Sequence, residues 1–102
     1  MNKVFTYGIF LDEDFTNSTF ARVIKREKAM LIGYKTDLHT RCPFYTIVKS
    51  KPLDMVEGCI IELTDHELLR MDRTEGTKIH LYDRIKVNTD KGYVFAYIEG
   101  KP

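Results

Sequence analysis

The sequence predicts an α+β protein, built as a small mixed β-barrel of about six strands with two main flanking helices. Short apolar or β-branched runs recur between turn formers, and two segments have helical spacing. A single helix lies where a βαβ unit is possible, so a mixed, mainly antiparallel sheet is favoured. The length of 102 residues suits one domain, and we expect residues 1–102 to form it.

The N-terminal part predicts a strand, a bend and a helix. Residues 4–7 form the first expected strand, and Gly8 marks a point where the backbone can turn. The acidic residues 12–14 are interpreted as a solvated polar exit from that strand. Asn17 or Ser18 can then cap a helix running to about Lys28, in which Phe20, Val23 and Ile24 follow helical spacing.

Three further strands are expected in the middle of the chain. Residues 29–34, 44–48 and 55–63 are apolar or β-branched runs, with Pro43 and Pro52 between them. Cys59 lies in the last of these runs, where we expect it to be a small buried apolar residue.

A second helix and a hairpin complete the chain. Thr64 followed three residues later by Glu67 is a capping box, and Gly76 is placed to end the helix. Its apolar face is expected to comprise Leu68, Leu69 and Met71. Residues 81–89 and 93–99 alternate in character around the turn at 90–92, which predicts a hairpin.

Composition excludes several classes of function. Sixteen basic and fifteen acidic residues give a net charge of +1, and the basic residues are spread along the chain, which argues against nucleic-acid binding. Apolar runs fall short of the roughly 20 residues that span a bilayer, and the N-terminus lacks signal-peptide character. We therefore expect a cytoplasmic protein without a membrane partner. Cys42 and Cys59 are too few for a disulfide framework, which agrees with a reducing compartment.

Glu75 is the strongest candidate for acid/base chemistry. On a helix it shares a face with Leu68, seven residues earlier, so its carboxylate is directed toward the core or a cleft. Burial and the negative end of the helix dipole both raise the pKa of such a carboxylate, toward the range a general base needs. The alternative is a frayed helix end with Glu75 in solvent.

The segment Tyr7-Gly8-Ile9-Phe10 is a second candidate. A glycine at a strand end lets the chain turn sharply and leave successive N–H groups pointing outward. Such groups can hold a carboxylate or an oxyanion, although an ordinary turn also explains the pattern.

Other patterns carry less weight. His39 and Cys42 fall on opposite faces of an extended chain, which disfavours a catalytic pair. The acidic residues 12–14 lack EF-hand spacing, and His66 and His80 lack a partner at zinc-site spacing. We therefore expect no metal and no organic cofactor.

Six segments occur in the order of a known family and span nearly the whole chain. They are Val4-Phe5-Thr6-Tyr7-Gly8, Gly33 with Pro43, Val56-Glu57-Gly58, residues 68–76, Tyr82-Asp83-Arg84 and Ala96-Tyr97. Together they resemble the gamma-glutamylcyclotransferase-like family. The most specific part is Asp72 to Gly76, which is similar to the end of the family's Leu-Asp-x-x-Glu-Gly helix, with Met71 in the Leu position.

The resemblance implies a fold, a site and a reaction. The fold is a compact barrel with flanking helices and a pocket between the Tyr-Gly loop and the helix-end glutamate. Family enzymes close a γ-glutamyl group into 5-oxoproline and release an amine. By position the acid/base role falls to Glu75, and substrate binding falls to Tyr7, Gly8, Ile9 and Phe10. Tyr82 and Tyr97 are further candidates to line the pocket.

The chain departs from the family where Tyr-Gly-Thr-Leu or Tyr-Gly-Ser-Asn is usual. Ile9 and Phe10 stand there instead, which removes a hydroxyl donor. Two hypotheses follow. The first is a cofactor-independent cyclotransferase that acts on a small γ-glutamyl amide. The second is a binding module that holds a small anionic ligand in the same pocket without turnover.

Overall fold

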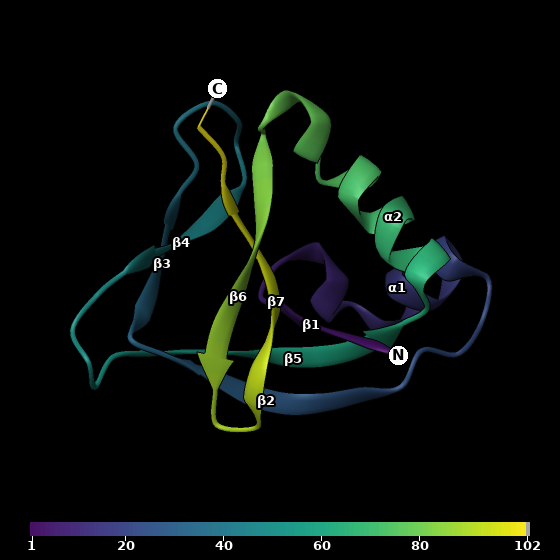
Figure 1. Cartoon of the computed structure of the whole chain (residues 1–102), viewed down its shortest axis with the longest axis horizontal. Coiled ribbons are helices and arrows are strands. Elements are labelled where there is room, and N and C mark those ends of the chain that lie inside the picture. The colour runs from purple at the N-terminus through teal and green to yellow at the C-terminus, as the bar shows by residue number, and fades with distance from the viewer. Residues whose placement is uncertain (102) are drawn as a thin grey trace.

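A closed barrel of five strands forms the centre of the computed structural model, which describes residues 1–101. The strand order is β1 (Asn2–Thr6), β5 (Met55–Leu63), β2 (Arg26–Ile32), β6 (Tyr82–Thr89) and β7 (Gly92–Glu99). Neighbours are antiparallel except β1 and β7, which pair in parallel and close the barrel. The α+β barrel predicted from the sequence is confirmed (Figure 1).

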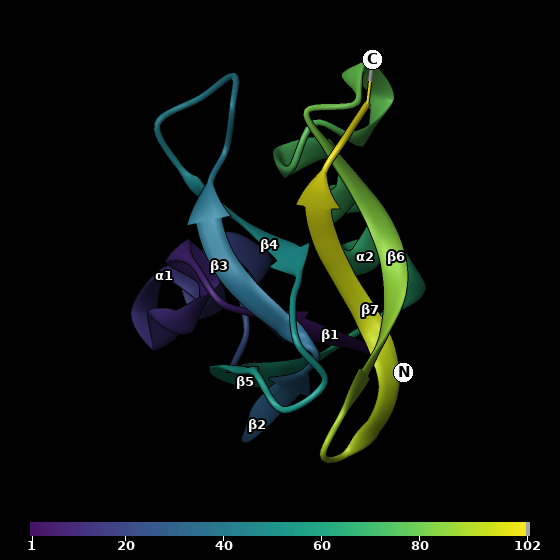
Figure 2. The same ribbon diagram turned by 90° about the vertical axis from the view of Figure 1, so that its left-hand side faces the viewer.

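A separate two-stranded sheet stands beside the barrel. It consists of β3 (Tyr34–Leu38) and β4 (Tyr45–Lys49), and Figure 2 shows it next to β7. The backbone N–H of Glu99 in β7 donates to Thr46 Oγ1 in β4 at 2.7 Å, which ties the two sheets together. The sequence did not predict β3, because its polar residues are mostly exposed and show no apolar alternation.

The first helix lies earlier than predicted. α1 spans Glu13–Phe20 and is capped by Asp12, whose carboxylate accepts from the Phe15 N–H at 2.9 Å. The acidic segment expected to be a loop is therefore the cap and first turn of the helix, where negative charge is favourable. Ala21, in the left-handed conformation, ends the helix.

The predicted extension of this helix to Lys28 is wrong. Residues from Arg26 onward belong to β2, and Val23 points into solvent. Asn17 is inside the helix rather than at its cap, and its side-chain oxygen accepts from the Ile24 N–H at 2.9 Å. That bond holds the extended segment that leaves the helix.

α2 (Asp65–Thr74) begins as predicted. Thr64 Oγ1 accepts from the Glu67 N–H at 3.1 Å, and the Glu67 carboxylate accepts from the Thr64 N–H at 2.8 Å. Gly76 follows the helix with φ of +69°, a conformation that favours glycine. Leu68 and Met71 are buried as expected, whereas Leu69 is exposed and does not belong to the apolar face.

Two buried clusters form the core. One lies between the barrel and the helices and includes Leu68 and Met71, and the other fills the barrel around Phe5 and Ile47. Cys59, expected to be buried, is half-buried, and both cysteines are free thiols. Within residues 1–101, no helix combines the length and hydropathy that crossing a membrane requires.

Candidate active site

A cavity of about 440 Å³ opens at the end of β1, between α2 and the connection from β3 to β4. Its lining includes every site residue that the sequence nominated, namely Tyr7, Gly8, Ile9, Phe10, Glu75, Tyr82 and Tyr97. The remaining lining residues are Phe5, Thr6, Phe15, Phe44, Tyr45, Met71, Thr74 and Leu81. The volume lies within the usual range for small-molecule sites.

Glu75 occupies the C-cap position of α2. Its N–H donates to the Met71 carbonyl at 2.8 Å, so helical geometry is kept up to this residue. The capping box fixes where the helix begins, and the burial of Leu68 and Met71 fixes which face points inward. Glu75 therefore lies on the same inward face of α2 as Leu68 and Met71, and Gly76, in the left-handed conformation, ends the helix after it.

The Glu75 carboxylate is half-buried and has no hydrogen-bond or ion-pair partner within residues 1–101. Burial raises its pKa from 4.5 to about 7. Arg84 offers no compensation, because its Nη1 lies 3.2 Å from Asp72 Oδ2 and its charge is balanced there. A carboxyl with this pKa can both accept and return a proton near neutral pH.

The loop after β1 forms the facing wall. A single 3-10 turn covers Ile9–Leu11, and within residues 1–101 the N–H groups of Ile9 and Phe10 find no hydrogen-bond acceptor. Ile9 is exposed at the mouth, whereas Phe10 is buried and packs on the rings of Phe15 and Phe20. The loop thus presents free backbone donors and no side-chain hydroxyl.

Gly8 lies at the turn from β1 into this loop without a left-handed backbone conformation. Its φ is −126°, and a Cβ added there would meet nothing within 4 Å. An added methyl group would therefore occupy open space on a residue that lines the cavity, without a clash against the barrel. The substitution Gly8→Ala is accordingly a probe of ligand contact at this wall.

Three cavity tyrosines have their hydroxyl groups engaged elsewhere in the protein. Tyr7 Oη donates to the Tyr97 carbonyl at 2.5 Å, and Tyr97 Oη donates to Asp72 Oδ1 at 2.6 Å. Tyr82 Oη donates to the Tyr45 carbonyl at 2.7 Å. Burial raises the pKa of all three phenols, so they stay neutral. Their rings form the walls, while their hydroxyls hold neighbouring strands in place.

Phe44 and Tyr45 are cavity residues that the sequence argument missed. Both are exposed at the mouth, Phe44 at the end of the connection between β3 and β4 and Tyr45 as the first residue of β4. Two adjacent aromatic residues directly after Pro43 were interpreted only as the start of a strand. Two adjacent aromatic residues after the mainly polar residues 35–43 were the available sequence signal.

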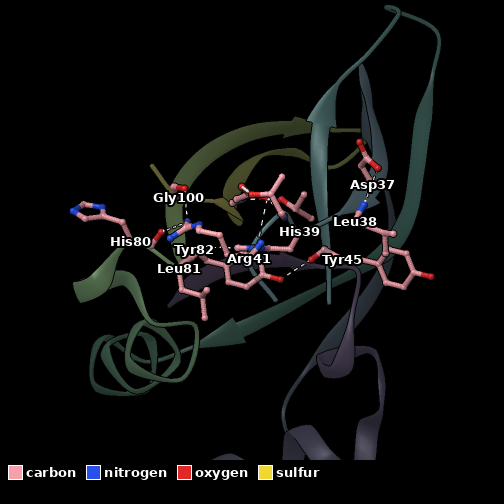
Figure 3. Close-up of polar contacts among 12 residues, drawn as sticks. Asp37, Leu38, His39, Arg41, Tyr45, His80, Leu81, Tyr82 and Gly100 are labelled. Atoms are coloured by element: carbon pink, nitrogen blue, oxygen red, sulfur yellow. Dashed lines mark hydrogen bonds and ion pairs between the residues drawn. The ribbon is translucent and has the colours of Figure 1, made fainter. Parts of the chain in front are cut away.

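His39 anchors that same connection. Its Nδ1 accepts from the Arg41 N–H at 2.9 Å, so Nε2 carries the proton and donates to the Leu81 carbonyl at 2.7 Å (Figure 3). Both ring nitrogens are thus engaged by backbone, which leaves His39 a structural role. Within residues 1–101, no three His, Cys, Asp or Glu side chains come together as potential metal ligands.

Comparison with known proteins places this site in context. A family model described as "Gamma-glutamyl cyclotransferase, AIG2-like" matches residues 4–101. No curated protein sequence matches the chain.

Solved structures share the fold. The solution structure of one Arabidopsis thaliana protein has a TM-score of 0.78 at 27% identity, covering 99% of this chain and 72% of that one. For a second Arabidopsis thaliana protein the TM-score is 0.80 at 28% identity, with coverage of 96% and 61%. A structure named gamma-glutamyl cyclotransferase has a TM-score of 0.78 at 21% identity, with coverage of 98% and 67%.

Proposed function

The chain belongs to the AIG2-like gamma-glutamyl cyclotransferase family, and from this premise we propose that it converts a small γ-glutamyl amide into 5-oxoproline and a free amine. The observation that carries the proposal is the Glu75 carboxyl. It is half-buried, lacks a cationic partner within residues 1–101, and opens into the cavity that the Tyr7–Phe10 segment also lines. Perturbed carboxyls in such cavities are characteristic of acid/base sites.

Substrate binding is assigned to the loop that faces Glu75. The free N–H groups of Ile9 and Phe10 are suited to the carboxylate or carbonyl oxygens of a γ-glutamyl group. The rings of Tyr7, Tyr82 and Tyr97 supply apolar contact for its methylene carbons.

In the proposed reaction, Glu75 first takes a proton from the substrate's α-ammonium group. The freed nitrogen attacks the γ-carbonyl carbon, and a five-membered ring closes through a new C–N bond. Glu75 then returns the proton to the nitrogen of the original amide, and that C–N bond breaks. The ring nitrogen gives up its second proton through Glu75 to the departing amine, which leaves as an ammonium ion. One amide gives one 5-oxoproline and one amine, and water is not consumed.

The pKa of Glu75 suits both halves of this exchange. An α-ammonium group has a pKa of roughly 8, so a carboxylate whose pKa is raised to about 7 accepts its proton at little cost. A glutamate with an ordinary pKa of 4.5 is a far weaker base for the same transfer.

The substitution Glu75→Gln tests the proposal. Glutamine keeps the size of the side chain but cannot accept the proton, so 5-oxoproline formation should fall about 10²–10⁴-fold. Mass spectrometry of 5-oxoproline over a panel of γ-glutamyl amides is the measurement, and the exposed Glu57→Gln is the matched control. Turnover that survives Glu75→Gln would move the catalytic role elsewhere.

A binding module is the second candidate, because Ile9 provides no hydroxyl at the mouth where relatives carry one. In that case the parent protein binds a small anionic ligand in the cavity and produces no 5-oxoproline from any amide. Calorimetric titration alongside the turnover assay separates the two functions.

A further inference from the structure

The cavity has an uneven distribution of polar groups. Among its lining residues in the described part of the chain, Glu75 is the single acidic or basic side chain. The hydroxyls of Tyr7, Tyr82 and Tyr97 are directed to protein partners, as described above, and Thr74 Oγ1 donates to the Arg70 carbonyl at 3.1 Å. The Glu75 carboxyl and the N–H groups of Ile9 and Phe10 are thus polar groups left open to a ligand.

An apolar rim surrounds the mouth of the same cavity. It consists of Ile9, Phe15, Phe44 and Tyr45, which are 60%, 37%, 62% and 60% exposed. Large apolar side chains that stay exposed together at a cavity mouth mark a contact surface. The three acidic residues at the start of α1 do not belong to the cavity lining, so they place no charge within it.

The part of the rim that carries Phe44 and Tyr45 is held in place. Arg41 Nη2 donates to the carbonyls of His80 at 2.7 Å and Gly100 at 2.6 Å. The His39 ring, on the connection before Phe44, donates to the Leu81 carbonyl, and the Tyr82 hydroxyl donates to the carbonyl of Tyr45, as Figure 3 shows. This part of the rim is thus preorganised, and preorganised contacts contribute more to affinity than mobile ones.

We propose that this rim is the subsite for the leaving amine and that it selects γ-glutamyl amides of uncharged, apolar amines. The inference rests on the proposed cyclotransferase function and specifies its substrate class. With the glutamyl head on the loop N–H groups and its γ-carbonyl near Glu75, the amine substituent extends toward the mouth. An alkyl or arylalkyl substituent buries apolar surface there. An ammonium or carboxylate held against the rim loses hydration and gains no partner.

A matched pair of substrates tests this selection. γ-Glutamylhexylamide and γ-glutamylcadaverine have equal chain length and differ in a terminal methyl or ammonium group. We expect the parent protein to favour the hexylamide in kcat/KM by about tenfold or more. If γ-glutamylcadaverine is the better substrate, or an equal one, the selection is overturned while the cyclotransferase function stands.

Variants of Phe44 locate the subsite. γ-Glutamylmethylamide serves as a short reference substrate. Phe44→Ala should lower kcat/KM for γ-glutamylhexylamide relative to this reference by about tenfold, because the ring no longer contacts the hexyl chain. Phe44→Glu should move the preference toward γ-glutamylcadaverine, since a carboxylate at the rim pairs with its ammonium. Leu53→Ala is the control, because Leu53 is 87% exposed and does not line the cavity. Equal ratios in all variants would place the amine elsewhere.

A binding experiment separates the failure of this inference from the failure of the proposed function. If the parent turns over neither amide, calorimetry with the same pair still reports on the rim. A preference for the hexylamide that disappears in Phe44→Ala would remove the cyclotransferase function and keep the apolar subsite. Equal binding of the two amides would overturn the subsite itself.

Discussion

The glutamates at the two ends of α2 have opposite electrostatic environments and opposite pKa shifts. Glu67, in the first turn, is clamped by Arg22, whose Nε and Nη2 lie 2.6 and 2.7 Å from its carboxylate oxygens. That pairing lowers the pKa of Glu67 to about 2. Glu75, at the last turn, has no such partner within residues 1–101, and burial raises its pKa to about 7.

The difference indicates that the two glutamates of one helix have different roles. At its N-terminus the Glu67 carboxylate accepts from one backbone N–H, lies at the positive end of the dipole and binds an arginine, so it stabilises the fold as an anion. At the C-terminus the same residue type lacks all three supports. Glu75 therefore gives little to stability in its charged form and is suited to proton exchange.

The largest expected effect concerns the pH dependence of turnover. If the Glu75 carboxylate is the base, kcat/KM should rise about tenfold per pH unit below its pKa, or about 100-fold over two units. The rise should level off near pH 7, given the raised pKa. Initial rates across a pH series with one γ-glutamyl amide measure it. A profile that is flat below pH 7 would contradict the role of Glu75.

Glu67→Gln should produce the next largest effect, and it should appear in stability. The change weakens the Arg22 pair and the capping box, at an expected cost of about 1–2 kcal/mol in the free energy of unfolding. Urea denaturation measures this loss. Turnover per folded molecule should be retained, because Glu67 does not line the cavity. A large loss of turnover in fully folded Glu67→Gln would mean that the two helix ends are not independent.

The stability of the two glutamine variants should also diverge with pH. The pKa of Glu67 falls from 4.5 to about 2 on folding, so its contribution is present above pH 4.5 and is lost as the pH falls toward 2. The pKa of Glu75 rises from 4.5 to about 7, so the folded state binds its proton more tightly. Relative to Glu75→Gln, the parent should lose stability as the pH rises from 4.5 to 7. The free energy of unfolding of the parent and of both variants, measured at several pH values, tests both expectations. If the parent and a variant show the same dependence on pH, the pKa shift assigned to that glutamate is wrong.

The smallest expected effect comes from Asp72→Asn. Asparagine can still accept from Tyr97 Oη, but it no longer balances the charge of Arg84. The pKa of Glu75, one helical turn away, should then fall, and the acid limb of the rate profile should move to lower pH by less than about one unit. A shift to higher pH would show that Arg84 does not act on Glu75.

Local signals explain what the sequence could predict. The capping box at Thr64 and the left-handed glycine at position 76 mark the two ends of α2, and apolar spacing then fixes the face of Glu75. The hairpin of β6 and β7 likewise depends on adjacent turn residues. Each of these features is decided by neighbours along the chain.

Long-range contacts explain what was missed. Phe44 and Tyr45 reach the cavity because His39 binds Leu81 and Arg41 binds Gly100, pairs separated by 42 and 59 positions. No local pattern encodes such bonds. The displaced first helix has a different cause. Asp12 was assigned to a loop on its charge, although an acidic residue just before a helix is also a good cap.

Four of the six tyrosines line the cavity, and the chain contains no tryptophan. Intrinsic ultraviolet fluorescence therefore originates largely beside the proposed site, without the indole emission that usually dominates a protein spectrum. A ligand that enters the cavity should change the intensity of this emission directly. The protein thus contains its own optical reporter, and amides can be screened against the unlabelled molecule.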